Sequence, residues 1–421
     1  MPSISIQSKQ LFIASCLALL VTSLSFGIRA GILGQLGVQF LLNKTELAVI
    51  TATAFWGFPL AIIIGGMVVD VVGMKNLHSL HLFVIWQASC SLFFNGFLVF
   101  VLSTLLIGIA NGTVEAACNP LVTAIYPNNK TTRLNHFHLW FPGGIVIGTL
   151  IVYFFSKAGI GWQWQVATML LPTFIYGYLF YRLSFPVTDR VASGVTTKEM
   201  YASLATPLFL FLLLCMLGTA TTELFTGQWL NLLLSNVVEN PILLLATTAG
   251  VMVVGRGLAG PVVHKLSPQG VLLASAVFAA FGIYLLANTT GSMLFVGALV
   301  FGIGVCYFWP TMLGFVSENL PKTGAVGINL LGGAGVLAMS LYTIFMGGVF
   351  DDMIAKQLPQ GADLKAYNAP EATAEMKAAL FEATKAAGPS VLNTTLLIPI
   401  GLILAFGGLF FYMRKKVTLR K

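Results

Sequence analysis

The chain has 421 residues, of which 57% are hydrophobic and only 9% are charged, whereas an ordinary soluble domain has about 25% charged residues. This composition excludes a water-soluble enzyme, and we read the net charge of +8 as a sign of membrane topology rather than of nucleic-acid binding. Twelve spans of about 20 residues need about 240 apolar residues, which this chain supplies. We expect an all-α integral membrane protein with twelve transmembrane helices.

Long apolar runs broken by polar turns predict two groups of six helices. The first six lie near residues 11–36, 47–69, 77–94, 97–126, 135–156 and 164–183. The second six lie near residues 204–234, 241–263, 270–287, 292–317, 327–350 and 391–413. The polar stretch between the groups predicts a cytoplasmic linker over 186–203, with one six-helix bundle over 1–185 and another over 204–421.

Lys and Arg are retained on the cytoplasmic side of membranes, and this rule sets the predicted orientation. Most of them fall in one alternating set of loops and in both terminal segments, whereas the short loops of the other set hold only Lys44 and Lys157. We therefore expect both termini in the cytoplasm and a plasma or bacterial inner membrane location. An outer-side insert over 351–389 contains an Ala, Glu and Lys-rich stretch from Pro370 to Ala387, which favours a surface helix.

The sequence contains no motif for a bound metal, a cofactor or ATP-driven transport. The five cysteines all lie in apolar runs and form neither CxxC nor Cys/His pairs. A phosphate-binding GxxxxGK[ST] loop is also absent from the sequence. We expect no metal site and no cofactor, with transport energy drawn from an ion gradient.

Glycine and proline landmarks recur at nearly constant spacing in the two halves. Pro120 pairs with Pro310, and Gly66 pairs with Gly260. Duplicated six-helix units with a substrate site between them near the bilayer midplane are one architecture of secondary transporters. The repeat therefore favours a transporter.

A glycine-containing loop joins the second and third predicted helices. Gly66, Asp70, Gly73 and Lys75 stand in the spacing GxxxDxxGxK, which resembles the signature loop of the major facilitator superfamily. Glycines let helix ends approach closely, the carboxylate can interact with helix N-termini, and the lysine can anchor at headgroups. The resemblance covers nearly the whole chain and implies a conformational role for this loop. The family usually has a basic residue after the aspartate, where this chain has Val71.

Four ionisable residues fall inside predicted spans: Arg29, Glu115, Glu223 and Arg256. Charges at that depth are costly, so they face partners or wet cavities and mark transport pathways and proton relays. We expect Glu115 and Glu223 to couple protons and Arg29 to contact substrate. Arg256 lies close to an inner loop, where bonding to helix-end carbonyls is the stronger alternative, so we group it with the conformational residues.

Helical spacing indicates which polar side chains share a face. Asn111, Glu115 and Asn119 recur every four residues and predict a polar stripe in the fourth helix. The superfamily resemblance implies that this helix, with the first, seventh and tenth, lines the cavity. Either Glu223 or Glu115 could pair with Arg29, and the sequence leaves this choice open.

The segment from about Asn95 to Gly144 carries a closer resemblance. It has Glu115, small residues and then Asn119-Pro120, followed by Leu134-Asn135 at the start of the fifth helix. This pattern is similar to the fucose permease branch, whose members are sugar:proton symporters. The resemblance implies proton coupling at Glu115, an adjacent amide at Asn119 and a sugar-facing side chain at His138.

The first helix departs from that branch. The family has an acidic residue in the cavity there, whereas this chain has Arg29 near that point and no acid in the first helix. A guanidinium can clamp a carboxylate or phosphate through two parallel hydrogen bonds. This departure favours an anionic substrate as an alternative to a neutral sugar.

Aromatic and amide side chains supply further candidate contacts to a sugar-like solute. Trp229 follows Gln228 shortly after Glu223, and Trp309 precedes Pro310 in the tenth helix. Tryptophan can stack on the C–H face of a sugar, and the amides of Asn111, Asn119 and Gln228 can bind hydroxyl groups. Packing is the more common role of each tryptophan.

These patterns predict a monomeric secondary transporter that imports a sugar or sugar-like solute by proton symport, with sodium as the other possible coupling ion. One alternative is a transporter of an organic anion or sugar acid that uses Arg29 as the anion clamp. A drug or lipid exporter and a membrane sensor without solute flux are two more. Besides the bilayer, the expected partners are a small-molecule solute and a proton.

Overall fold

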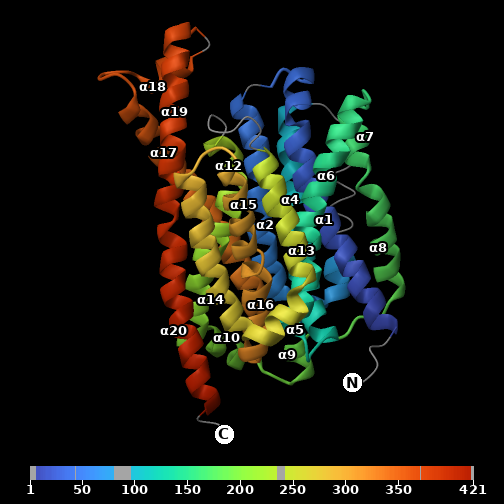
Figure 1. Cartoon of the computed structure of the whole chain (residues 1–421). Helices are drawn as coiled ribbons and strands as arrows, with labels where there is room; N and C mark the ends of the chain where they lie inside the picture. Colours follow the sequence, from blue (N-terminus) through green and yellow to red (C-terminus); the bar gives the residue numbers. More distant parts are fainter. Residues whose placement is uncertain (1–5, 43, 80–95, 235–241, 370, 419–421) are drawn as a thin grey trace. The chain divides into compact units, whose positions relative to one another are not determined.

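Helices form all the regular secondary structure in the described part of the chain (Figure 1). The computed structural model describes residues 6–42, 44–79, 96–234, 242–369 and 371–418. In the first part of the chain the helices are α1 (Ile6–Gln39), α2 (Lys44–Val72), α4 (Phe97–Ile125), α5 (Lys130–His138), α6 (Trp140–Lys157), α7 (Trp162–Ala167), α8 (Leu170–Arg182), α9 (Asp189–Ala192) and α10 (Thr197–Leu204).

The remaining helices include one π-helical segment, η1, and one 3-10 turn, η2. In chain order they are α11 (Pro207–Ala220), η1 (Thr221–Phe225), α12 (Thr226–Leu233), α13 (Ile242–Gly257), α14 (Ala259–Asn288), α15 (Met293–Val305), α16 (Phe308–Asn319), η2 (Pro321–Thr323), α17 (Gly324–Gln357), α18 (Leu364–Asn368), α19 (Ala374–Thr395) and α20 (Leu397–Thr418).

Nine helices of the described residues are long and apolar enough to span a membrane, and Leu243–Gly257 is a shorter apolar helix. Most of the third predicted span, 77–94, lies outside the described residues. The stretch predicted as a surface helix falls largely in α19, which runs on to Thr395 and is followed at once by α20. The last predicted span therefore begins inside a helix that starts in the insert.

Several predicted spans are divided between successive helical elements in the structure. The fifth comprises α5 and α6, the seventh comprises α11, η1 and α12, and the tenth comprises α15 and α16. The eighth and ninth spans meet inside α14 at Ser267, whose φ of 60° marks a kink just before Pro268. Since the backbone must leave helical geometry there, the kink separates the two predicted spans.

Contacts group the chain into two compact units, each with its own packing. Unit 1 comprises the described parts of Met1–Leu214, Arg256–Val263 and Pro310–Leu337. Unit 2 comprises those of Cys215–Gly255, His264–Trp309 and Ala338–Lys421.

Glycines bring the helices of unit 1 into backbone contact. A Cβ atom at Gly27 of α1 would lie 2.7 Å from the carbonyl oxygen of Ile145 in α6, and Gly148 of α6 faces the α1 backbone in return. Gly108 and Gly112 of α4 lie in the same way against the α2 backbone. Close approach of this kind replaces the hydrophobic effect as the source of helix association in lipid.

Unit 2 uses the same device between α14 and α15. Gly282 lies against the backbone of Phe301, and Gly304 lies against that of Ala279. Gly388 of α19 packs against the carbonyl of Leu233 at the end of α12. The insert helix is therefore packed against unit 2 at its C-terminal half.

Candidate functional site

A ladder of buried polar side chains crosses α1, α4 and α5 inside unit 1. The Asn111 amide donates to the Ser25 hydroxyl at 3.0 Å, and the Asn119 amide donates to the Glu115 carboxylate at 2.9 Å. The imidazole Nε2 of His138 lies 3.0 Å from the Asn119 Oδ1 atom. All five side chains are buried, and Glu115 is only 2% exposed. We call these five residues the polar ladder.

The hydrogen bonds of Asn119 assign the proton on His138. Asn119 donates through Nδ2 to Glu115, so its Oδ1 atom must accept from the imidazole. His138 therefore carries a hydrogen on Nε2. The structure thus joins Glu115, Asn119 and His138, which were predicted to act at the site, through one amide group.

Arg256 closes the ladder at its α5 end. Its Nη1 atom donates at 2.8 Å to the backbone carbonyl of His138, the last residue of α5, and Arg256 is only 1% exposed. The carbonyl is available because the residue four positions further on, Pro142, has no backbone N–H to donate to it. Bonding of Arg256 to a helix-end carbonyl, one of its two predicted roles, is what the structure shows.

Helices α1 and α4 run antiparallel. Near one end the rings of Phe40 and Phe100 lie 4.9 Å apart, and near the other the rings of Phe12 and Tyr126 lie 5.3 Å apart. Residue numbers therefore fall along one helix as they rise along the other. This direction fixes where the charged residues of the two helices lie relative to each other.

Arg29 and Glu115 lie on opposite sides of the bond between Ser25 and Asn111. Each is four residues beyond its bonded neighbour, which is about 6 Å along a helix axis. Because the helices are antiparallel, the two displacements add to about 12 Å. The backbone positions of Arg29 and Glu115 are therefore about 12 Å, or slightly more than two helical turns, apart along the helix axes.

Aromatic rings face the guanidinium of Arg29. Its Cζ atom lies 5.0 Å from the ring centre of Phe26 and 5.4 Å from that of Phe55. Arg29 is 8% exposed, and within the described residues its buried Nη1 atom has no hydrogen-bond acceptor. Sequence reasoning missed both rings, although Phe26 stands three residues before Arg29 on the same helical face. Phe55 belongs to α2, and no sequence pattern indicated that its ring would lie near Arg29.

In unit 2, Glu223 lies within the π-helical segment η1 and is buried. Buried threonine hydroxyls surround it along the chain, and that of Thr222 donates at 2.8 Å to the carbonyl of Gly218. π-Helical turns are rare and occur frequently at functional sites. The sequence predicted Glu223 but carried no signal for the π-turn.

The predicted aromatic contacts of unit 2 differ in their surroundings. The ring of Trp229 stacks on Phe225 at 5.1 Å, and Tyr342 meets Phe225 edge-on at 4.9 Å. Trp309 is buried, and its indole N–H has no acceptor among the described residues. Gln228 is exposed. Trp229 therefore belongs to an aromatic cluster, whereas the neighbouring side chain of Gln228 lies at the surface of the protein.

The signature loop contacts the segment between the sequence halves. The Asp70 carboxylate accepts from Arg190 Nε at 2.5 Å and from the Thr188 hydroxyl. Arg190 thus supplies the cation that position 71 lacks. Lys75 donates to the carbonyls of Tyr181 and Leu183 at the end of α8, at 2.9 Å and 3.2 Å.

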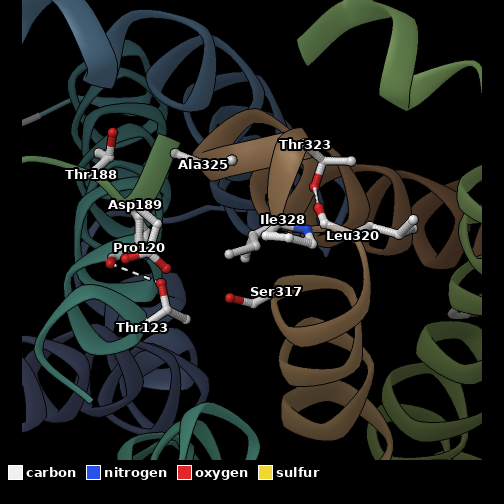
Figure 2. A pocket seen from close by; sticks show the side chains of 11 residues that line it. Pro120, Thr123, Thr188, Asp189, Ser317, Leu320, Thr323, Ala325 and Ile328 are labelled. Atoms are coloured by element: carbon white, nitrogen blue, oxygen red, sulfur yellow. Dashed lines mark hydrogen bonds between the residues drawn. The ribbon is translucent and has the colours of Figure 1, made fainter. Parts of the chain in front are cut away.

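Further contacts gather at the same end of unit 1, which we call the linker end and define by Pro120–Arg133, Thr188–Arg190 and Ser317–Ile328. Lys130 pairs with Asp189 at 2.5 Å, and the Thr131 amide donates to Glu318 at 2.9 Å. Figure 2 shows the small pocket between these segments, with Thr188 and Asp189 on one side and Ser317 on the other. These pairings could not be predicted, because the linker residues that form them lie in a polar stretch without a motif.

A cluster suited to a metal ion is absent from the described residues, where no group of three or more His, Cys, Asp or Glu side chains converges. The ladder is instead a set of hydrogen-bonding groups with one carboxylate, and a separate guanidinium lies one helical turn away. Such groups can bind a polar solute and hold a proton.

A sequence profile of the Major Facilitator Superfamily matches residues 11–350. The chain belongs to this superfamily. It is therefore a transporter with the superfamily's twelve-helix, all-α membrane fold, and not an enzyme.

Solved structures with the same fold include sugar transporters. The FucP transporter, described in its outward conformation, superposes with a TM-score of 0.68 at 16% identity, covering 93% of this chain and 98% of its own. The proton:xylose symporter XylE gives 0.65 at 14% identity, with 94% and 95% coverage. The human organic anion transporter MFSD10 gives 0.66 at 13% identity, with 96% and 100% coverage.

A curated relative is the Major facilitator superfamily domain-containing protein 4A of Xenopus tropicalis, which is 29% identical over 138 residues. The match spans 30% of this chain and 27% of that relative. This match agrees with the family assignment.

Proposed function

We propose that this transporter imports a sugar or sugar-like solute by proton symport. The observation that carries the proposal is the buried Glu115 carboxylate, held by Asn119 within the polar ladder. An acid at that depth in a membrane protein is costly and is typical of proton relays. The amide and hydroxyl groups of Asn111 and Ser25 on the same ladder are suited to sugar hydroxyls.

The fold neighbours support the same class of solute. FucP is described as a fucose:proton symporter of E. coli and XylE as a proton:xylose symporter. Identities of 15% and 14% show the common fold alone, so the proposal depends on the residues of this chain. The resemblance of the segment around Glu115 and Asn119 to the fucose permease branch adds to it.

In the proposed cycle, Glu115 takes up a proton from the outer side, and solute then binds to the ladder. The transporter next changes to the state that is open inward, in the manner of alternating access about a midplane site. Release of solute and proton inside completes import. Glu223, on its π-turn, is the second candidate for proton binding, and Gln228, Trp229 and Trp309 are candidate contacts to solute.

We further propose a plasma or bacterial inner membrane location with both termini in the cytoplasm. The distribution of Lys and Arg over the loops supports this orientation. The linker end of unit 1 then faces the cytoplasm.

The first test is solute-induced alkalinisation of a lightly buffered suspension of expressing cells, measured for neutral hexoses and for sugar acids. We expect a pH rise that a protonophore abolishes. Glu115→Gln should lose proton-driven accumulation but keep solute exchange, because a glutamine preserves the hydrogen bond to Asn119 without a titratable group.

Glu371→Gln is the matched control, because Glu371 is exposed in the insert and the same change there should leave accumulation intact. Full gradient-driven accumulation by Glu115→Gln would rule out this residue as the proton carrier. A solute response that persists with the protonophore present would count against proton symport as a whole.

A further inference from the structure

Arg29 stands out among the buried arginines of unit 1 because its charge has no protein counterpart among the described residues. Arg256 donates to the His138 carbonyl, and Arg190 pairs with Asp70. Arg29 is 8% exposed, and no acceptor within the described ranges receives its Nη1 hydrogens. A guanidinium carries its charge at neutral pH and has five N–H donors.

The rings of Phe26 and Phe55 account for only part of that environment. They lie 5.0 Å and 5.4 Å from the Cζ atom and offer a π-face, which attracts a cation but accepts no strong hydrogen bond. Burying a charged group without hydrogen-bond partners is strongly unfavourable. The Nη1 hydrogens of the guanidinium therefore await an acceptor from outside the described protein atoms.

Two further buried polar atoms without partners lie close by along the helices. Asn111 Oδ1 and Thr22 Oγ1 form no hydrogen bond with a described residue. Asn111 is bonded to Ser25, one helical turn from Arg29, or about 6 Å along the axis. A guanidinium with aromatic rings beside it, an unpaired amide oxygen about one turn away and an unpaired hydroxyl about two turns away fits a solute with one anionic end and a hydroxylated body.

We propose that the solute is anionic, a sugar-like molecule whose carboxylate or phosphate accepts two hydrogen bonds from Arg29. This inference rests on the proposed function, because it names the substrate class of the same site. The planar guanidinium matches both oxyanions in bidentate geometry. Phe26 and Phe55 lie beside the guanidinium, its Nη1 atom is left for the anion, and Ser25 and Asn111 meet hydroxyl groups.

The test is equilibrium binding to the purified, full-length transporter at neutral pH without a proton gradient. The probes are galactose, galacturonate and galactose 6-phosphate, and the same three forms of glucose, which differ only at carbon 6. Wild type should bind one anionic form at least about tenfold more tightly than the neutral sugar, which corresponds to about 1.4 kcal/mol. Arg29→Gln should abolish this preference for the anionic form.

Arg29→Lys keeps the charge without the planar fork, so it should retain a reduced preference, and it serves as a second variant should the glutamine form fold poorly. Arg133→Gln is the matched control, because Arg133 also lies over a ring, at 4.6 Å from Tyr126, but at the linker end. That variant should keep the full preference.

Equal or tighter binding of the neutral sugars, failure of both anionic forms to bind, or a preference that survives in Arg29→Gln would each overturn the inference. The carboxylate and phosphate probes show which oxyanion the site takes. Because binding is measured without a gradient, this result is independent of proton coupling. Tight anion binding without solute-induced alkalinisation would refute symport and leave the anion site standing.

Discussion

Asn119 uses both ends of its amide group, one toward Glu115 and one toward His138. An apolar side chain at this position would leave a buried carboxylate and a buried imidazole without that partner. Each such loss costs about 1–3 kcal/mol. We expect Asn119→Leu to lower the stability of the purified transporter by at least about 2 kcal/mol and to abolish proton-driven uptake.

Thermal unfolding in detergent and uptake into proteoliposomes measure these two effects. Asn393→Leu is the matched control, because its amide meets that of Asn288 at 3.0 Å in an exposed pair. That change should cost no more than about 0.5 kcal/mol. Similar losses in both variants would show that the buried position of Asn119 is of no special importance.

The residues of the polar ladder could be predicted to different degrees. The four-residue spacing of Asn111, Glu115 and Asn119 predicted a common face. In the structure Asn119 donates to Glu115, and all three are buried, as is every residue from Ala110 to Thr123 of α4. His138 was predicted only from the family resemblance, because a single histidine near the start of a helix forms no spacing pattern with other residues. The Phe55 ring over Arg29 comes from another helix, and such contacts depend on tertiary packing that no local pattern encodes.

At the scale of elements, hydrophobic runs located the spans but not their interruptions. The tenth span is interrupted at residues 306–307, between α15 and α16, one turn before Pro310, because a proline removes the hydrogen bond to the carbonyl four residues earlier. Nothing in the residues Thr221–Phe225 distinguishes a π-turn from an α-helix, because the extra residue is accommodated by packing on neighbouring helices. Sequence periodicity therefore predicts helix positions better than helix continuity.

The short helix α10 carries its own pH-sensitive cap. Bonds from the Thr196 backbone and hydroxyl to the Glu199 carboxylate lower the pKa of this exposed group below its ordinary value of 4.5. A lowered pKa in the folded state means that the cap stabilises α10 above pH 4.5 and is lost as the pH falls through the folded value. We expect amide protection of 197–204 to weaken below pH 4.5.

Hydrogen exchange, corrected for the intrinsic pH dependence, measures this effect, and Glu199→Gln should remove it. The N-terminus of α19 provides an internal control. Thr373 caps that helix through the Met376 amide, and no carboxylate stands in the reciprocal position. Equal pH dependence at both helices would show that the Glu199 carboxylate is not its source.

For the whole molecule, the sequence predicted the superfamily, and the profile match over 11–350 confirms it. The signature loop predicted a conformational role for Asp70, but its partner could not be predicted. Arg190 belongs to the polar linker, and only folding brings it to 2.5 Å from Asp70. Long-range ion pairs of this kind depend on how distant segments meet.

The pair of Asp70 and Arg190 is expected to hold the linker end of unit 1 closed. Removing one member of a largely buried ion pair leaves the other charge uncompensated. We expect Arg190→Ala to raise the open population about tenfold, or about 1.4 kcal/mol. A cysteine placed by Ser317→Cys, which lines the pocket of Figure 2, should then react faster with a membrane-permeant maleimide.

The labelling experiment requires a parent protein in which the five native cysteines are replaced by alanine, so that only the cysteine at position 317 reacts. Lys322→Ala serves as the control, because the pair of Lys322 and Glu199 is exposed and 3.9 Å apart, and its loss should leave the labelling rate unchanged. An unchanged rate in Arg190→Ala would show that the linker arginine does not close this end.

The π-turn at Glu223 bears on how this transporter is aligned with its relatives. Such a turn contains one residue more than an α-helical turn, so a relative that lacks it aligns with a one-residue gap somewhere in 221–225. Each residue corresponds to a rotation of about 100° around a helix axis. With the gap placed there, the position aligned with Trp229 keeps the same orientation, whereas an alignment without the gap would pair every residue beyond 225 with one rotated by about 100° around the helix axis.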